Sequence, residues 1–213
     1  MTDRPQPLTT DAESAFMLAE YESLRQFWLA QSTAGEARLN YYLLTVSAAV
    51  VGIGLVNQLA DRAIVPYVSG ALIVGVFFIG LVTFARIVER TISMTQYVRG
   101  MNRIRRYFTD RQSALAEYLI LPTVDDVPAF RSMSLRGRGL SAVGLSQTVA
   151  IINSILAGSG AMIVLRVTLT LDNVWAIAGG LLVFGLIYLS QSRFYAGRVA
   201  EAGKRTVVKF PSS

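Results

Sequence analysis

Four stretches of this chain carry no charged residue, and each is long enough to cross a lipid bilayer. They cover residues 41–59, 65–85, 145–165 and 174–190. A helix of about 20 apolar residues crosses the roughly 30 Å of hydrocarbon in a membrane. Core helices of a soluble bundle would instead show a polar stripe at each turn, and polar residues are numerous enough to suggest one only in the stretch at 145–165, the most polar of the four. The sequence therefore predicts an all-α membrane protein with four transmembrane helices.

The composition is typical of a membrane protein, and it lacks residue types that many enzymes need for catalysis. Charged residues make up 16% of the chain, whereas soluble domains carry about 25%. Cysteine and histidine are absent, which removes the thiol nucleophile, the commonest general base and the commonest metal ligands. The adjacent Asp125 and Asp126 lie in a proline-flanked loop, where turn residues are expected. We therefore expect neither an enzyme nor a metal or cofactor site.

The distribution of basic residues predicts the orientation in the membrane. The loops at 60–64 and 166–173, which we call the joints, are short, so the spans pair into two hairpins. Each joint holds one arginine. The segment 86–144 holds ten basic residues, including Arg131, Arg136 and Arg138, and the tail after residue 190 holds five. Because basic residues gather in cytoplasmic segments, both termini and the middle segment are expected in the cytoplasm.

The predicted organisation has five parts. In chain order they are a polar leader with an amphipathic helix (1–40), the first transmembrane hairpin (41–85), a basic cytoplasmic helix and loop (86–144), the second hairpin (145–190) and a basic tail (191–213). The first forty residues are polar and acidic, so no cleavable signal peptide is expected.

Two cytoplasmic helices are predicted to pack against each other. In the first, an apolar stripe recurs at four-three-four spacing, at Met17, Tyr21, Leu24 and Trp28, which places these side chains on one helix face. Helical spacing also continues beyond the second span and predicts a helix that extends toward residue 118. Its own apolar stripe and its basic flank complement the acidic first helix.

That second helix carries a run of arginines, "MTQYVRGMNRIRRYF" at 94–108, that contains no acid. Three interpretations remain open: the run fixes the orientation of the span, binds anionic lipid if the helix lies flat, or binds a phosphate-bearing ligand. Arginine pairs with phosphate in a bidentate manner, and aromatic rings stack on bases. The candidate anion-binding residues are Arg99, Arg103, Arg105, Arg106, Arg111 and Tyr97.

The third span is the most polar of the four. Its candidate pore-lining residues are Gln147, Asn153, Ser154 and Ser159. Polar side chains within hydrocarbon face either other helices or water. Interhelical hydrogen bonding, worth about 0.6 kcal/mol per bond, and the lining of a pore around an oligomer axis are therefore both consistent with this span.

This architecture of small helical hairpins with cytoplasmic helical extensions resembles the transmembrane effectors of bacterial anti-phage defence systems, of the SLATT-like and Hailong types. The resemblance implies a homo-oligomeric pore that depolarises the bacterial inner membrane when a nucleotide or oligonucleotide binds. The alternative is a non-conducting membrane scaffold that docks a cytoplasmic protein partner on its helical extensions.

Overall fold

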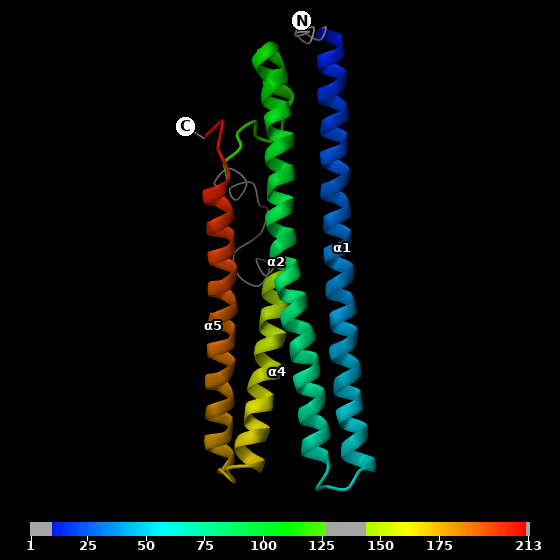
Figure 1. The fold of residues 1–213 in the computed structure, drawn as a ribbon, viewed down its shortest axis with the longest axis vertical. Coiled ribbons are helices and arrows are strands. Elements are labelled where there is room, and N and C mark those ends of the chain that lie inside the picture. Colours follow the sequence, from blue (N-terminus) through cyan, green and yellow to red (C-terminus); the bar gives the residue numbers. More distant parts are fainter. Residues whose placement is uncertain (1–9, 127–143, 212–213) are drawn as a thin grey trace, which may run out of the picture. The chain divides into compact units, whose positions relative to one another are not determined.

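The computed structural model describes residues 10–126 and 144–211. The elements along the chain are α1 (Thr10–Leu59), α2 (Val65–Arg111), the 3₁₀ helix η1 (Ser113–Tyr118), α4 (Leu145–Val167) and α5 (Asn173–Arg205) (Figure 1). No strand occurs in these residues. The polar leader at 1–9 and the loop arginines Arg131, Arg136 and Arg138 lie outside the described part of the chain. The predicted all-α class is confirmed for the part that is described.

All four long helices are apolar and long enough to cross a membrane. Only 6% of the most apolar stretch of α1 and 11% of that of α5 are buried within the chain, against 39% for α2. Soluble monomers rarely expose apolar surface on this scale, whereas lipid solvates it. The prediction of four membrane-length helices is therefore confirmed, and these helices are those of a multi-pass membrane protein.

The chain divides into two compact units. The extension unit comprises Met1–Thr33, Ile92–Leu135 and Arg205–Ser213, and the span unit comprises Ala34–Thr91 and Arg136–Lys204. Helices α1 and α2 each run through both units without a break. The α-helix of α2 ends at Arg111, and the residues up to Tyr118 form η1, so the basic helix is shorter than its longest predicted extent.

Close backbone contact joins helices within the span unit. A Cβ atom on Gly158 would lie 2.8 Å from the carbonyl oxygen of Gly180, and one on Gly180 would lie 2.8 Å from that of Gly158. Small residues at such crossings let helix backbones approach in a membrane, where packing rather than the hydrophobic effect drives association. Helices α4 and α5 therefore pack through these two glycines.

The predicted packing of the two extension helices is confirmed. A Cβ atom on Gly100 of α2 would lie 2.8 Å from Leu24 Cδ1 of α1. Tyr97 of α2 stacks on Phe27 of α1 with ring centroids 5.9 Å apart, and the four residues of the apolar stripe on α1 are all partly covered. The α1 segment of this unit thus lies against the part of α2 that carries Tyr97 and Gly100.

Candidate functional site

The arginine run of α2 is mostly engaged with other parts of the extension unit. Arg103 makes the central contact: its Nε donates to Asp125 Oδ2 at 2.6 Å, and its Nη2 donates to the carbonyl oxygen of Val207 at 2.6 Å. It therefore joins α2 both to the segment after η1 and to the C-terminal segment.

Asp125 is completely buried and is held by four groups. Besides Arg103, the backbone N–H groups of Lys209 and Phe210 donate to its carboxylate at 3.1 and 2.8 Å. Its own N–H donates to the carbonyl oxygen of Phe210 at 3.0 Å. We call this arrangement of Arg103, Asp125 and the N–H groups of residues 209 and 210 the carboxylate clamp.

The clamp keeps Asp125 ionised. Burial alone would raise the pKa of this carboxyl group, but the hydrogen bonds from Phe210, Arg103 and Lys209 outweigh burial and hold its pKa below the ordinary value. Two consecutive N–H groups and a guanidinium form the kind of concave donor set that binds anions generally. The sequence interpretation assigned Asp125 only to a turn and so missed this role.

Arg99 differs from the other arginines of the run. It is 3% exposed, and its Nε and Nη1 atoms have no hydrogen-bond partner among the described residues. Burial lowers its pKa, the charge of Asp125 opposes that shift, and the charge of Arg103 adds to it. A buried cation with unpaired donors is costly, which marks Arg99 as a place where an anion or water would be stabilising.

The remaining arginines bind the chain's own side chains. Arg105 donates to Tyr21 Oη at 2.8 Å and to Asn102. Arg106 pairs with Asp110 at 2.7 Å and lies over the ring of Phe210.

Arg111 completes the run at the end of α2. It pairs with Glu13 of α1 at 2.7 Å, and its guanidinium lies 3.8 Å from the centre of the Tyr107 ring. Of the six residues predicted to bind an anion, two, Arg99 and Arg103, therefore lie near the Asp125 carboxylate. The other four contact other protein groups of the extension unit, and Tyr97 does so by stacking on Phe27.

The polar residues of α4 meet a second cluster, within the span unit. Tyr42 of α1 donates from its hydroxyl to Asn153 Oδ1 at 2.7 Å, and Asn153 Nδ2 donates to Gln191 Oε1 of α5 at 3.1 Å. The exposed fractions of these three side chains are 2%, 0% and 5%. On α2, Gly80 leaves the necessary room, since a Cβ atom there would lie 1.8 Å from Asn153 Oδ1. We call Tyr42, Asn153 and Gln191 the polar network.

The four residues predicted to line a pore lie in different surroundings. Asn153 belongs to the polar network, and Ser154, also fully buried, donates to the carbonyl oxygen of Ala150 at 2.7 Å. Gln147 is exposed and accepts from the N–H of Gly144 at the start of α4, while Ser159 is partly covered. Within the single chain, Asn153 therefore forms hydrogen bonds between helices, which is one of the two roles considered for the polar residues of this span.

Sequence reasoning missed Tyr42, Gln191 and Gly80 as partners of Asn153. Tyr42 and Gln191 stand at the edges of apolar stretches, where a polar residue is ordinary.

Comparison with models of protein families gives no match for this chain, and neither curated proteins nor solved structures show significant similarity. The geometry of the carboxylate clamp and of the polar network is thus what bears on function.

Proposed function

We propose that the chain is one subunit of an oligomeric channel in the bacterial inner membrane, opened from the cytoplasm by an anionic ligand. The ligand is a nucleotide or a short single-stranded oligonucleotide that binds at the arginine run. In this proposal the four helices cross the membrane as two hairpins and the extension unit is cytoplasmic, as the positive-inside rule predicts. Opening depolarises the membrane, which is the activity expected of an anti-phage effector.

The carboxylate clamp is the observation that carries this proposal. Its donors, the Arg103 guanidinium and the N–H groups of Lys209 and Phe210, hold a carboxylate that belongs to the chain itself. A phosphate group offers more charge and more acceptor oxygens than a carboxylate, so it competes for the same donors. Arg99, whose Nε and Nη1 atoms bond to nothing in the described part of the chain, supplies a further partner once phosphate replaces the carboxylate.

Helix α2 connects ligand binding to the spans. It runs without interruption from Val65 to Arg111, so Gly80, which accommodates the amide of Asn153, lies on the same helix as Arg103. In the closed state Asn153 is paired with Tyr42 and Gln191. In the proposed open state these pairs exchange for water in a path between subunits, because unpaired polar groups in a membrane turn toward water.

A flux assay tests the proposal. Purified protein is reconstituted into vesicles that hold a potassium gradient, and the membrane potential is followed while nucleotides, cyclic dinucleotides and short oligonucleotides are added. We expect at least one of them to collapse the potential with the wild-type chain. Arg103→Gln should abolish the response, and Asn153→Leu should abolish conduction while ligand binding survives.

Arg25→Gln is the matched control, because Arg25 is also an arginine of the extension unit but, among the described residues, pairs only with its exposed neighbour Glu22 on the same helix. It should respond as the wild type does. Vesicles that stay tight with every ligand, or an Arg103→Gln variant that responds normally, would contradict the proposal.

A scaffold that docks a protein partner is the second candidate, and a specific observation favours it. Several large apolar side chains of the extension unit are exposed, among them Phe16 (62%), Leu18 (59%) and Ile120 (91%). Exposed apolar surface outside the membrane marks an interaction site. This function predicts that Phe16→Ser and Ile120→Ser disrupt activity in cells, while Asn153→Leu leaves it intact. The flux assay distinguishes the two functions, because a scaffold leaves vesicles tight.

A further inference from the structure

The two joints between the candidate spans each hold a single arginine, and both arginines line one cavity. This joint cavity, of about 650 Å³, is bordered by residues of α1, α2, α4 and α5 and lies in the span unit. Its polar lining residues are Asn57, Arg62, Ser69, Arg166 and Asn173. The volume is within the range of roughly 300–1,000 Å³ that small-molecule sites occupy.

One lining residue of the joint cavity carries a buried hydroxyl group. Ser69 is 4% exposed, and its Oγ makes no hydrogen bond to any of the described residues. A buried polar atom without a hydrogen bond is destabilising unless a ligand or water supplies one. The buried Ser69 hydroxyl therefore indicates that this cavity holds an occupant with polar atoms.

The charges that line the cavity are positive. Arg62 and Arg166 are both exposed residues of its lining, and Arg166 uses one N–H to donate to the carbonyl oxygen of Leu171 at 2.9 Å. A guanidinium has five N–H groups, so donors remain for a ligand. Asp61 and Asp172 lie in the same joints but are not lining residues. The occupant indicated by this lining is an anion.

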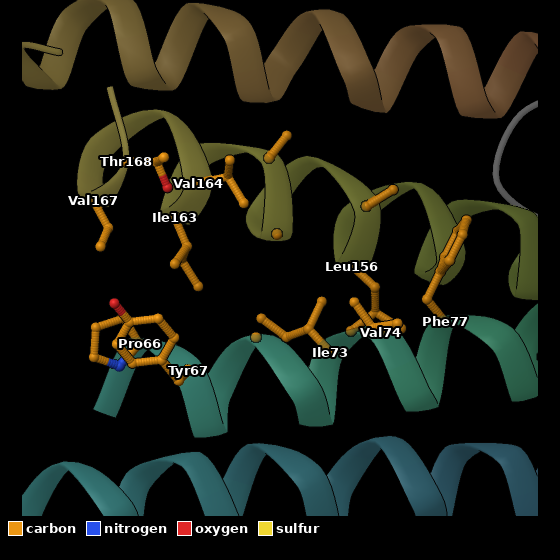
Figure 2. A pocket seen from close by; sticks show the side chains of 14 residues that line it. Pro66, Tyr67, Ile73, Val74, Phe77, Leu156, Ile163, Val164, Val167 and Thr168 are labelled. Atoms are coloured by element: carbon orange, nitrogen blue, oxygen red, sulfur yellow. The ribbon is translucent and has the colours of Figure 1, made fainter. Parts of the chain in front are cut away.

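An apolar groove adjoins the joint cavity. The α2–α4 groove, of about 400 Å³, shares Pro66, Ile163 and Val167 with the cavity. Figure 2 shows Ile163 and Val167 of α4 facing the helix that bears Tyr67 and Ile73. The other residues that line the α2–α4 groove are almost all apolar. A polar, cationic cavity that continues into an apolar groove fits a ligand with an anionic head and a hydrocarbon chain.

The depth of the site agrees with this chemistry. Arg166 directly follows the apolar stretch at residues 145–165, and Arg62 lies three residues beyond the end of the stretch at 41–59. Side chains in such positions reach the headgroup layer of a bilayer. The inference rests on the four helices spanning the membrane and is independent of conduction.

We propose that the span unit binds one anionic phospholipid. The lipid phosphate accepts from Arg62 and Arg166, and the Ser69 hydroxyl donates to a headgroup or ester oxygen. One acyl chain lies in the α2–α4 groove.

Gly70 provides a way to fill the groove without disturbing the helices. It lines the groove, and a Cβ atom built on it meets nothing within 4 Å. Gly75 is equally open on the same helix but lines neither the groove nor the joint cavity. Gly70→Leu and Gly75→Leu therefore form a matched pair that differs in whether the new side chain enters the groove.

The test is native mass spectrometry of the full chain released from nanodiscs that contain equal amounts of phosphatidylglycerol and phosphatidylcholine. We expect the wild type and Gly75→Leu to retain one phosphatidylglycerol. Arg62→Gln combined with Arg166→Gln should bind it at least ten-fold more weakly, and Gly70→Leu should do so with both arginines in place. Circular dichroism establishes that each variant is folded.

Three results would overturn the proposal. Equal retention of both lipids by the wild type would remove the charge argument. Unchanged retention of phosphatidylglycerol by Gly70→Leu would show that no acyl chain lies in the groove. Release of the lipid by millimolar inorganic phosphate, with Gly70→Leu behaving as the wild type, would assign the cavity to a free anion instead. Because the assay measures lipid alone, its outcome does not depend on whether the chain conducts.

Discussion

At the scale of single residues, two buried polar side chains, Asn153 of the span unit and Asp125 of the extension unit, bond to partners from distant parts of the chain. Asn153 stands out because it is an amide within an apolar stretch, but its contacts with Tyr42 and Gln191 depend on how three helices are rotated. Asp125 gave no signal beyond its proline-flanked loop, because only the folded C-terminal segment brings the N–H groups of Lys209 and Phe210 to it.

Gly80→Ala is expected to destabilise the span unit. The new methyl group would lie 1.8 Å from Asn153 Oδ1, so the amide must move and its bonds to Tyr42 and Gln191 must lengthen. Forcing an extra carbon into a packed site costs about 1–3 kcal/mol. Thermal unfolding in detergent measures the change. Gly54→Ala, where a Cβ atom meets nothing within 4 Å, is the control, and equal melting temperatures for the two variants would contradict the packing described.

The carboxylate clamp should open in acid. The pKa of Asp125 is lowered in the folded chain, so the clamp stabilises the chain fully above the unfolded-state pKa of about 3.9. That stabilisation is lost as the pH falls through the lowered, folded-state value. Hydrogen exchange at Lys209 and Phe210, corrected for its intrinsic pH dependence, should therefore be slow from pH 7 to 5 and accelerate below pH 4. Asp125→Asn should show fast exchange throughout, and a wild type that loses protection already at pH 6 would contradict this assignment.

At the scale of elements, the helices were predictable where one physical rule dominates. Uncharged stretches of membrane length predict spans because lipid tolerates few charges, and all four such stretches fall within helices. The continuation of α2 into the arginine run also follows from helical periodicity. The arginine contacts do not, because Arg103 bonds to residues far along the chain, at 125 and 207.

Gly158→Val should weaken the contact between α4 and α5. A Cβ atom at Gly158 would lie 2.8 Å from the backbone oxygen of Gly180, and backbone cannot move aside as a side-chain end can. We expect a loss of stability of about 1–3 kcal/mol, seen as a lower melting temperature in detergent. Gly185→Val, on α5 with nothing within 4 Å of its Cβ position, should melt near the wild-type temperature. The contact is refuted if Gly158→Val melts as the control does.

At the scale of the whole molecule, the functional account depends on which segments lie on which side of the membrane. A cytoplasmic ligand reaches Arg103 only if the extension unit is inside, and a lipid headgroup reaches Arg62 and Arg166 only if both joints lie at a membrane surface. The distribution of basic residues predicts this arrangement.

Cysteine accessibility tests this arrangement directly, because the chain has no cysteine of its own. Single reporters at the exposed positions Ala63, Leu169 and Gln112 are treated with a membrane-impermeant maleimide in spheroplasts of a bacterial host. We expect Ala63→Cys and Leu169→Cys to react in intact spheroplasts and Gln112→Cys to react only after lysis. Labelling of Gln112→Cys before lysis, or protection of both joints until lysis, would contradict it.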